Sequence, residues 1–440
     1  MLRPELAAHI RHLTLTTPFK PIRPPKTKGL YRSNRKIIQQ ALTRAGLANV
    51  GDPETELRQA DHRALIGLIL AHAPRLVTLQ LHVAKDDPYL DAILVHAVDR
   101  GQKKSDTPQA VAFQVLRTLY LASADAPPIN LRARYRMRQI SYACMKKDRP
   151  FIRLPRLREL QIINAQLEDD LAMIQPEENS LTELTITFKS PVQNIQPVLR
   201  YTTKLTQLSL AVNVPGSQID LVMHEDLWKA ILPFRDQLQY LDLHEPRRTM
   251  YSQGHPNSRL TPQSGAVADG RHVSFCCPLH QFTKLRQLCI SPQLLLGHQC
   301  PHPSPTKFVS HLPPALESFA LYCGHNYIER LSEEVLAIPQ KKPRMPLNSI
   351  LIDTQTWWSR DLPCESITGA CRRNRIMLNT AGGDFLFYGG DRTHFADKTY
   401  DVIKSGEVHA ADLAWKKARD IMPKGLTVQT HSGTLDENWV

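Results

Sequence analysis

A short motif, Leu-x-x-Leu-x-Leu, recurs along most of this 440-residue chain and constrains its fold more than any other feature. Alternate side chains of a strand point to the same face, so each copy predicts a strand of roughly 4–6 residues with one apolar face. A strand repeated along a chain in this way predicts stacked structural units. The six closest matches are Leu76-Leu79-Leu81, Leu116-Leu119-Leu121, Leu157-Leu160-Ile162, Leu181-Leu184-Ile186, Leu205-Leu208-Leu210 and Leu238-Leu241-Leu243. Weaker matches are Ile10-Leu13-Leu15, Leu285-Leu288-Ile290, Leu316-Phe319-Leu321 and Leu347-Ile350-Ile352.

Helical patterns precede several of these strands. Residues 61–73 place apolar side chains at helical spacing, after which Pro74 ends the predicted helix and Leu76 begins the strand. Similar helices are predicted at 226–232 and at 308–312, each followed by proline. The alternation predicts an α/β fold, namely an irregular leucine-rich-repeat-like solenoid of short parallel strands and helices.

The spacing of the motif sets the expected domain organisation. Successive first leucines of the clear copies from Leu76 onward lie 24 to 47 residues apart, whereas regular leucine-rich repeats run about 20–29 residues. We assign residues 1–380 to the solenoid and interpret the polar, turn-rich segment 245–273 as a disordered insertion. Residues 381–440 lose the repeat and are expected to form either a C-terminal cap, with a helix at 410–421, or a partly disordered tail.

The chain is basic, with 55 lysine and arginine residues against 42 acidic residues, a net charge of +13. The densest local excess lies between Arg132 and Arg149. One interpretation is an electrostatic footprint for phosphates or for an acidic peptide. The other is the solvated face of an ordinary helix. A nucleic-acid-associated basic protein is therefore kept as the alternative function.

Three sequence features that are absent bear on the cellular compartment of the protein. No apolar run approaches the roughly 20 residues that cross a bilayer, and the first residues lack the pattern of a secretory signal. The eight cysteines follow no framework spacing, so we expect no disulfides. These features favour a cytoplasmic or nuclear protein that has no membrane association.

A search for catalytic and metal-binding motifs gives one weak candidate. The candidate zinc ligands are Cys276, Cys277, His280, His298, Cys300 and His302. Adjacent cysteines cannot both easily reach one tetrahedral ion, so scattered thiols and loop histidines are the favoured interpretation. No phosphate-binding glycine loop or nucleophile elbow is present. We therefore predict that the protein is not an enzyme, and we assign no catalytic, cofactor-binding or metal residue and no cofactor.

Two sets of residues are candidates for contact with a partner. Trp357-Trp358 form either an exposed anchor or a buried packing element, and both interpretations stay open. The strand residues that alternate with the leucines are geometric candidates for a binding face. They include Gln80, Tyr120, Gln161, Thr185 and Ser209.

Three phrases of the chain resemble the leucine-rich-repeat-like region of fungal F-box proteins. They are Glu-Leu-Ala-Ala-His-Ile-Arg-His-Leu-Thr-Leu at 5–15, Leu-Arg-Gln-Leu-Cys-Ile-Ser at 285–291 with Leu-Leu-Leu-Gly at 294–297, and Leu-Pro-Pro-Ala-Leu-Glu-Ser-Phe-Ala-Leu at 312–321. The resemblance covers about residues 5–380. It implies a substrate-recognition subunit of a ubiquitin ligase, in which an N-terminal F-box binds a Skp-type adaptor and thereby a cullin, while the repeats hold the target protein.

The N-terminal residues depart from this family. Residues 2–10 echo the opening of an F-box, but residues 14–28 are β-prone and then proline-rich where the family continues with apolar helices. We therefore expect the chain to begin inside the first repeat and to lack an intact F-box. The function predicted from the sequence is a non-enzymatic protein-interaction scaffold, with recruitment of targets to a ubiquitin ligase as the more specific expectation.

Overall fold

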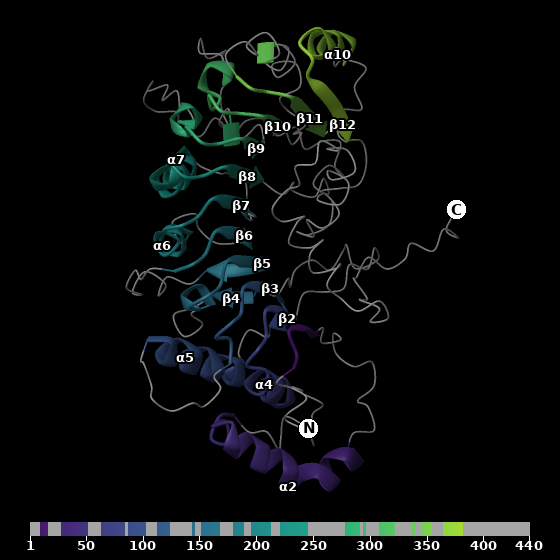
Figure 1. Ribbon diagram of the computed structural model, residues 1–440, viewed down its shortest axis with the longest axis vertical. Coiled ribbons are helices and arrows are strands. Elements are labelled where there is room, and N and C mark those ends of the chain that lie inside the picture. Colours follow the sequence, from purple (N-terminus) through teal and green to yellow (C-terminus); the bar gives the residue numbers. More distant parts are fainter. Residues whose placement is uncertain are drawn as a thin grey trace, which may run out of the picture. The chain divides into compact units, whose positions relative to one another are not determined.

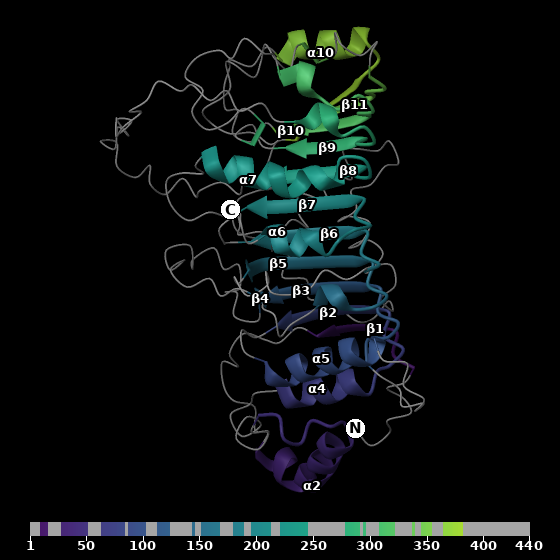
Figure 2. The same cartoon turned by 90° about the vertical axis from the view of Figure 1, so that its left-hand side faces the viewer.

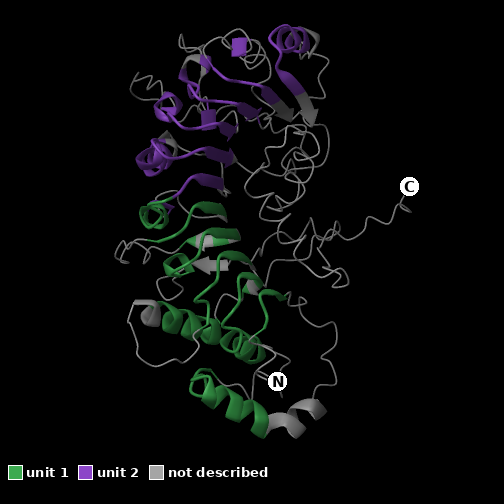
Figure 3. Cartoon of the chain, viewed as in Figure 1, with its two compact units in different colours: residues 1–188, 197–204, 413–440 green, residues 189–196, 205–412 purple. Residues whose placement is uncertain are grey.

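The computed structural model describes a defined part of the chain. The described residues are 9–15, 28–51, 63–83, 87–102, 112–123, 143–145, 151–167, 179–188, 195–212, 221–244, 278–290, 294–295, 308–321, 337–338, 345–353 and 364–381. They fall into two compact units, which are coloured separately in Figure 3. Unit 1 comprises residues 1–188, 197–204 and 413–440, and unit 2 comprises residues 189–196 and 205–412.

Unit 1 is an α/β unit whose described strands are all parallel, in the order β1-β2-β3-β5-β6, with β4 paired to β5 (Figure 1). Its strands are β1 (His12–Leu15), β2 (Thr78–Val83), β3 (Thr118–Ser123), β4 (Ala143–Met145), β5 (Glu159–Leu167) and β6 (Glu183–Phe188). Its helices are α2 (Lys28–Arg44), α4 (Arg63–Ala71), α5 (Pro88–Gln102) and the 3-10 turn η2 (Phe151–Arg153). The helix α6 (Ile195–Arg200) crosses the boundary between the two units.

Unit 2 repeats the same architecture, with parallel strands in the order β7-β8-β9-β10-β11-β12. Its strands are β7 (Gln207–Val212), β8 (Tyr240–His244), β9 (Gln287–Ile290), β10 (Ser318–Leu321), β11 (Ser349–Asp353) and β12 (Met377–Ala381). Its helices are α7 (Leu221–Ile231), α10 (Cys364–Arg373) and the 3-10 turns η5 (Leu232–Phe234), η7 (Leu279–Gln281) and η8 (Phe308–His311).

The leucines of the motif fall in register across neighbouring strands. In unit 1, Leu79, Leu119, Leu160 and Leu184 are consecutive partners, and each side chain is buried. In unit 2, Leu208, Leu241 and Leu288 form the equivalent column. Each of the ten copies of the motif coincides with a strand, so the prediction of short parallel strands is confirmed. The leucine-rich-repeat character of the array stays a prediction.

A tight turn leads into several strands and explains the recurrent prolines. The N–H of Leu76 donates to the carbonyl of Ala73 at 3.2 Å, and Leu157 and Leu316 make the same bond three residues back. The second residue of each turn is a proline, whose fixed φ suits that position. Pro74 therefore lies within a turn, and α4 already ends at Ala71.

Other expectations are corrected or lie outside the described residues. The segment predicted as a helix at 308–312 is only a short 3-10 turn, and residues 143–145, within the segment interpreted as a helix face, form strand β4. The remaining residues between Arg132 and Arg149, the insertion at 245–273 and the helix at 410–421 lie outside the described residues, and so does the tail beyond Ala381. The assignment of residues 1–380 to one array stays a prediction.

Candidate functional site

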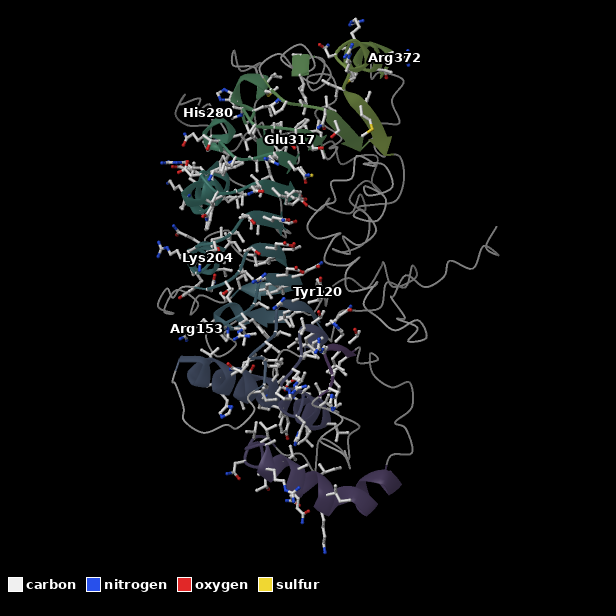
Figure 4. The ribbon with its side chains drawn as sticks, viewed as in Figure 1. Tyr120, Arg153, Lys204, His280, Glu317 and Arg372 are labelled. Atoms are coloured by element: carbon white, nitrogen blue, oxygen red, sulfur yellow. The ribbon has the colours of Figure 1, made fainter. Side chains whose placement is uncertain are left out.

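The third position of strands β2, β3, β5 and β6 in unit 1 carries a polar side chain. Gln80 on β2, Tyr120 on β3, Gln161 on β5 and Thr185 on β6 are consecutive partners in the sheet, and we call these four residues the polar row. They alternate with the buried leucines, so they point to the opposite face of the sheet. Figure 4 shows Tyr120 on the far side of the strands from Arg153, which belongs to η2. The structure thus brings four of the five residues predicted as geometric candidates into one row.

The side chains of the polar row are largely buried. Gln80 is half-buried, whereas Tyr120 and Gln161 are each 3% exposed and Thr185 is also buried. Tyr120, Gln161 and Thr185 are therefore not openly accessible, and their part in a binding face stays a prediction. Strand pairing aligns the three side chains.

Two carboxylates lie on the same face of the sheet as the polar row. Glu159 and Glu183 are partners at the first position of β5 and β6, two residues before Gln161 and Thr185. The hydroxyl of Thr118 donates to Oε2 of Glu159 at 3.2 Å. Burial, followed by these two carboxylates, raises the pKa of Tyr120 far above its ordinary value. The phenol of Tyr120 is therefore a neutral donor throughout the physiological range.

The buried amide of Gln161 is the chemically unsatisfied group of this row. Among the described residues, neither Nε2 nor Oε1 of Gln161 has a hydrogen-bond partner, and Oε1 of Gln80 also has none. Leaving a buried amide unpaired costs about 1–3 kcal/mol. Such a group in a native structure calls for an explanation, and an incoming ligand that pairs with it is one.

The fifth candidate, Ser209, belongs to unit 2 and has a different environment. Its hydroxyl donates to Oδ2 of Asp242 on the next strand at 3.0 Å, and the hydroxyl of Tyr240 donates to the same oxygen at 3.3 Å. All three side chains are buried. Ser209 therefore serves an internal hydrogen-bond network that fixes the positions of β7 and β8.

A second feature of unit 1 was not recognised from the sequence. The residues that directly precede the strands are linked by backbone hydrogen bonds: Val77 donates to Arg11, Arg117 donates to Val77 and Arg158 donates to Arg117, at 2.7–2.9 Å. Arg75 lies two residues before Val77, and Arg156 lies two residues before Arg158. Both arginines belong to the tight turns that lead into strands β2 and β5. We call Arg11, Arg75, Arg117, Arg156 and Arg158 the arginine edge. The recurrent phrase Pro-Arg-Leu, at 74–76 and 155–157, was the available signal.

All five side chains of the arginine edge are exposed. Within the part of the chain that the structure describes, none of them forms an ion pair. Figure 2 shows the strands of the unit pointing to the left, so that this edge follows their right-hand ends. The equivalent row of unit 2 is Thr206, Gln239, Arg286, Glu317 and Asn348, in which Arg286 pairs with Glu317 at 3.5 Å.

The candidate zinc ligands are only partly described. His280 lies in η7, where its ring packs edge-to-face on His311 of η8 at 5.8 Å, and the other five residues lie outside the described part of the chain. The described residues contain no group of three or more side chains suited to hold a metal ion. Trp357 and Trp358 also lie outside them. None of the described helices is long and apolar enough to cross a membrane.

The fold and the two features above define an α/β protein of parallel strands with a buried polar row and an exposed basic edge. Comparison with known protein families, with curated proteins and with solved structures finds no significant match.

Proposed function

We propose that this protein is a non-enzymatic interaction scaffold and that the polar row of unit 1 takes part in recognising a segment of a partner protein. The observation that carries the proposal is the buried amide of Gln161, which lies in the middle of a row of polar side chains and has no hydrogen-bond partner in the part of the chain that the structure describes. An amide offers both a donor and an acceptor, which is the combination that a peptide backbone needs. A bound polypeptide segment would pair both groups and remove the cost of leaving them unsatisfied.

The burial of the row has a kinetic consequence. A side chain that is 3% exposed is reached only after the atoms that cover it move aside. Binding that requires a conformational change associates more slowly than the usual 10⁵–10⁷ M⁻¹s⁻¹ of protein pairs. We therefore expect slow association and a long-lived complex.

The more specific part of the proposal comes from the resemblance to F-box proteins. The partner held by the strands is a protein destined for ubiquitination, and a Skp-type adaptor and a cullin join the complex if residues 2–10 belong to a working F-box. This part is separate from the role of Gln161, because it concerns other residues and other partners.

The test is affinity purification of the tagged full chain from a fungal lysate at moderate salt. Three forms are compared: the natural chain, Gln161→Leu, and Gln239→Leu as a matched control. Gln239 is an exposed glutamine just before β8. We expect proteins that are retained by the natural chain and by Gln239→Leu and are lost with Gln161→Leu. Identical protein sets for all three forms would contradict the role of the polar row. A Skp-type adaptor and a cullin among the retained proteins would support the ubiquitin-ligase part, and their absence would contradict it.

A further inference from the structure

The arginine edge of unit 1 concentrates positive charge on a rigid backbone. The row that precedes the strands runs Arg11, Val77, Arg117, Arg158 and Thr182, and it contains no acidic side chain. Arg75 and Arg156 add two more exposed charges close to it. Long, exposed and unpaired arginine side chains are costly to keep together because like charges repel. We propose that this edge binds the phosphate backbone of nucleic acid without regard to base sequence.

The spacing of the edge is set by the sheet. Neighbouring strands lie about 4.7–4.9 Å apart, so the three steps from Arg11 to Arg158 span roughly 14 Å. Five positive charges lie along this length. Each strand of a nucleic-acid duplex carries one negative charge per about 3.4 Å of the axis, so the strand that faces the edge presents about four phosphates over the same distance. Four phosphates on one strand nearly match the five arginines of the edge.

An acidic protein segment matches this density less well. An extended peptide advances about 3.4 Å per residue and alternates its side chains between two sides, so about two carboxylates would face the edge over 14 Å. Two negative charges leave three of the five arginines without partners. The comparison of charge densities therefore favours a polyphosphate over an acidic peptide.

The side chains of the arginine edge also indicate which part of a nucleic acid they contact. Guanidinium groups bind phosphate oxygens in a bidentate manner and form the commonest contacts to nucleic-acid backbones. The row of Arg11, Val77, Arg117, Arg158 and Thr182 has no aromatic side chain on which a base would stack, so it contacts phosphates and not bases.

Unit 2 provides an internal comparison. Its equivalent row carries a single arginine, Arg286, whose charge is balanced by Glu317 at 3.5 Å. The row itself is therefore balanced in unit 2 and strongly basic in unit 1, while the positions two residues earlier carry exposed cations in both units, Arg75 and Arg156 in unit 1 and Lys284 in unit 2. The positive charge is a property of the side chains at this edge of unit 1, not a necessary result of the fold.

The experiment measures fluorescence anisotropy of a fluorescein-labelled 20-base-pair duplex of mixed sequence, titrated with the full chain at several salt concentrations. The edge variant replaces Arg75, Arg117, Arg156 and Arg158 by alanine. The control variant replaces four exposed cations of unit 2, Arg235, Lys284, Arg286 and Arg372, and so removes the same charge. Circular dichroism confirms that both variants fold.

We expect the natural chain to bind with an affinity that falls steeply with salt. The edge variant should lose affinity at least about tenfold at low salt, and the slope of log K against log salt should decrease in magnitude by about 3 to 4, since each phosphate contact contributes about 0.9. The control variant should keep most of the slope. Equal losses in both variants, or no binding by the natural chain, would overturn the proposal. Binding of a fluorescein-labelled polyglutamate that depends on the edge, without binding of the duplex, would also overturn it in favour of an acidic protein partner.

Discussion

Gly67 of α4 lies directly against Tyr89 of α5, and a Cβ atom placed on Gly67 would come within 2.9 Å of the Cβ of Tyr89. Contacts this short essentially do not occur, so the two helices approach each other at a point where only glycine fits. Both residues are buried, and the helices lie side by side in Figure 2. The glycine therefore sets the distance between α4 and α5.

Replacement of Gly67 by alanine should destabilise unit 1. The added methyl group must displace Tyr89, and overpacking of this kind costs roughly 1–3 kcal/mol. The measurement is the free energy of unfolding in urea, followed by circular dichroism. Gly369→Ala in α10 is the control, because its new methyl group meets only the end of the Arg373 side chain at 3.5 Å. There alanine should be neutral or stabilise the helix by about 0.5–1 kcal/mol. Equal effects of the two changes would show that helix propensity, and not the approach to Tyr89, decides the outcome.

Gln161→Leu should raise the stability of the folded chain. Leucine has a similar size and removes two buried polar atoms that have no partner among the described residues, and such atoms cost about 1–3 kcal/mol. Thermal unfolding should therefore shift to higher temperature while partner capture is lost, as expected where a binding site is kept at the expense of stability. Gln161→Ala should instead destabilise, because it leaves a cavity. A lower melting temperature for Gln161→Leu would indicate that the amide is paired after all.

Trp228 of α7 and Phe282, next to η7, should be energetically coupled. Their rings meet edge-to-face with centroids 6.3 Å apart and both side chains are buried. A double-mutant cycle with Trp228→Leu and Phe282→Leu should give a coupling of about 0.5–1.5 kcal/mol in the free energy of unfolding. A cycle that pairs Trp228→Leu with Ile367→Val in α10 serves as the reference for side chains without a ring contact, and we expect additivity there. Additivity in the first cycle would mean that the aromatic geometry contributes nothing beyond burial.

Cys371 and Cys289 should resist alkylation in the folded protein. Both thiols are buried and neither forms a disulfide with another described residue, and burial raises the pKa of the Cys371 thiol above its ordinary value. The thiolate is the reactive form, so Cys371 stays protonated and unreactive at pH 8. Pulsed iodoacetamide labelling, read out residue by residue by mass spectrometry, should modify both only after addition of denaturant. Rapid labelling of Cys371 in buffer alone would show that α10 opens readily.

The strand positions followed from the sequence because their cause is local. Leucines at alternate positions bury one face of a strand, and this requirement is visible without knowledge of the partner strand. Helix α4 was predicted for the same reason, since its apolar spacing is continuous. Helix α2 was missed because it begins at Lys28, within a segment whose prolines and basic residues suggest an irregular chain. Strand β4 was missed because three residues carry no period, and its pairing with β5 decides its conformation.

The residues of the polar row could be predicted from the sequence, whereas the arginine edge could not. The sequence alone determined which residues alternate with the leucines, and parallel pairing in register then placed Gln80, Tyr120, Gln161 and Thr185 in one row. Only the tertiary structure decided that Gln161 is buried and has no hydrogen-bond partner among the described residues, because burial depends on atoms far away in the chain. Only the tertiary structure gathered Arg11, Arg117 and Arg158 along one edge, since they are distant in sequence and are aligned by backbone hydrogen bonds between strands.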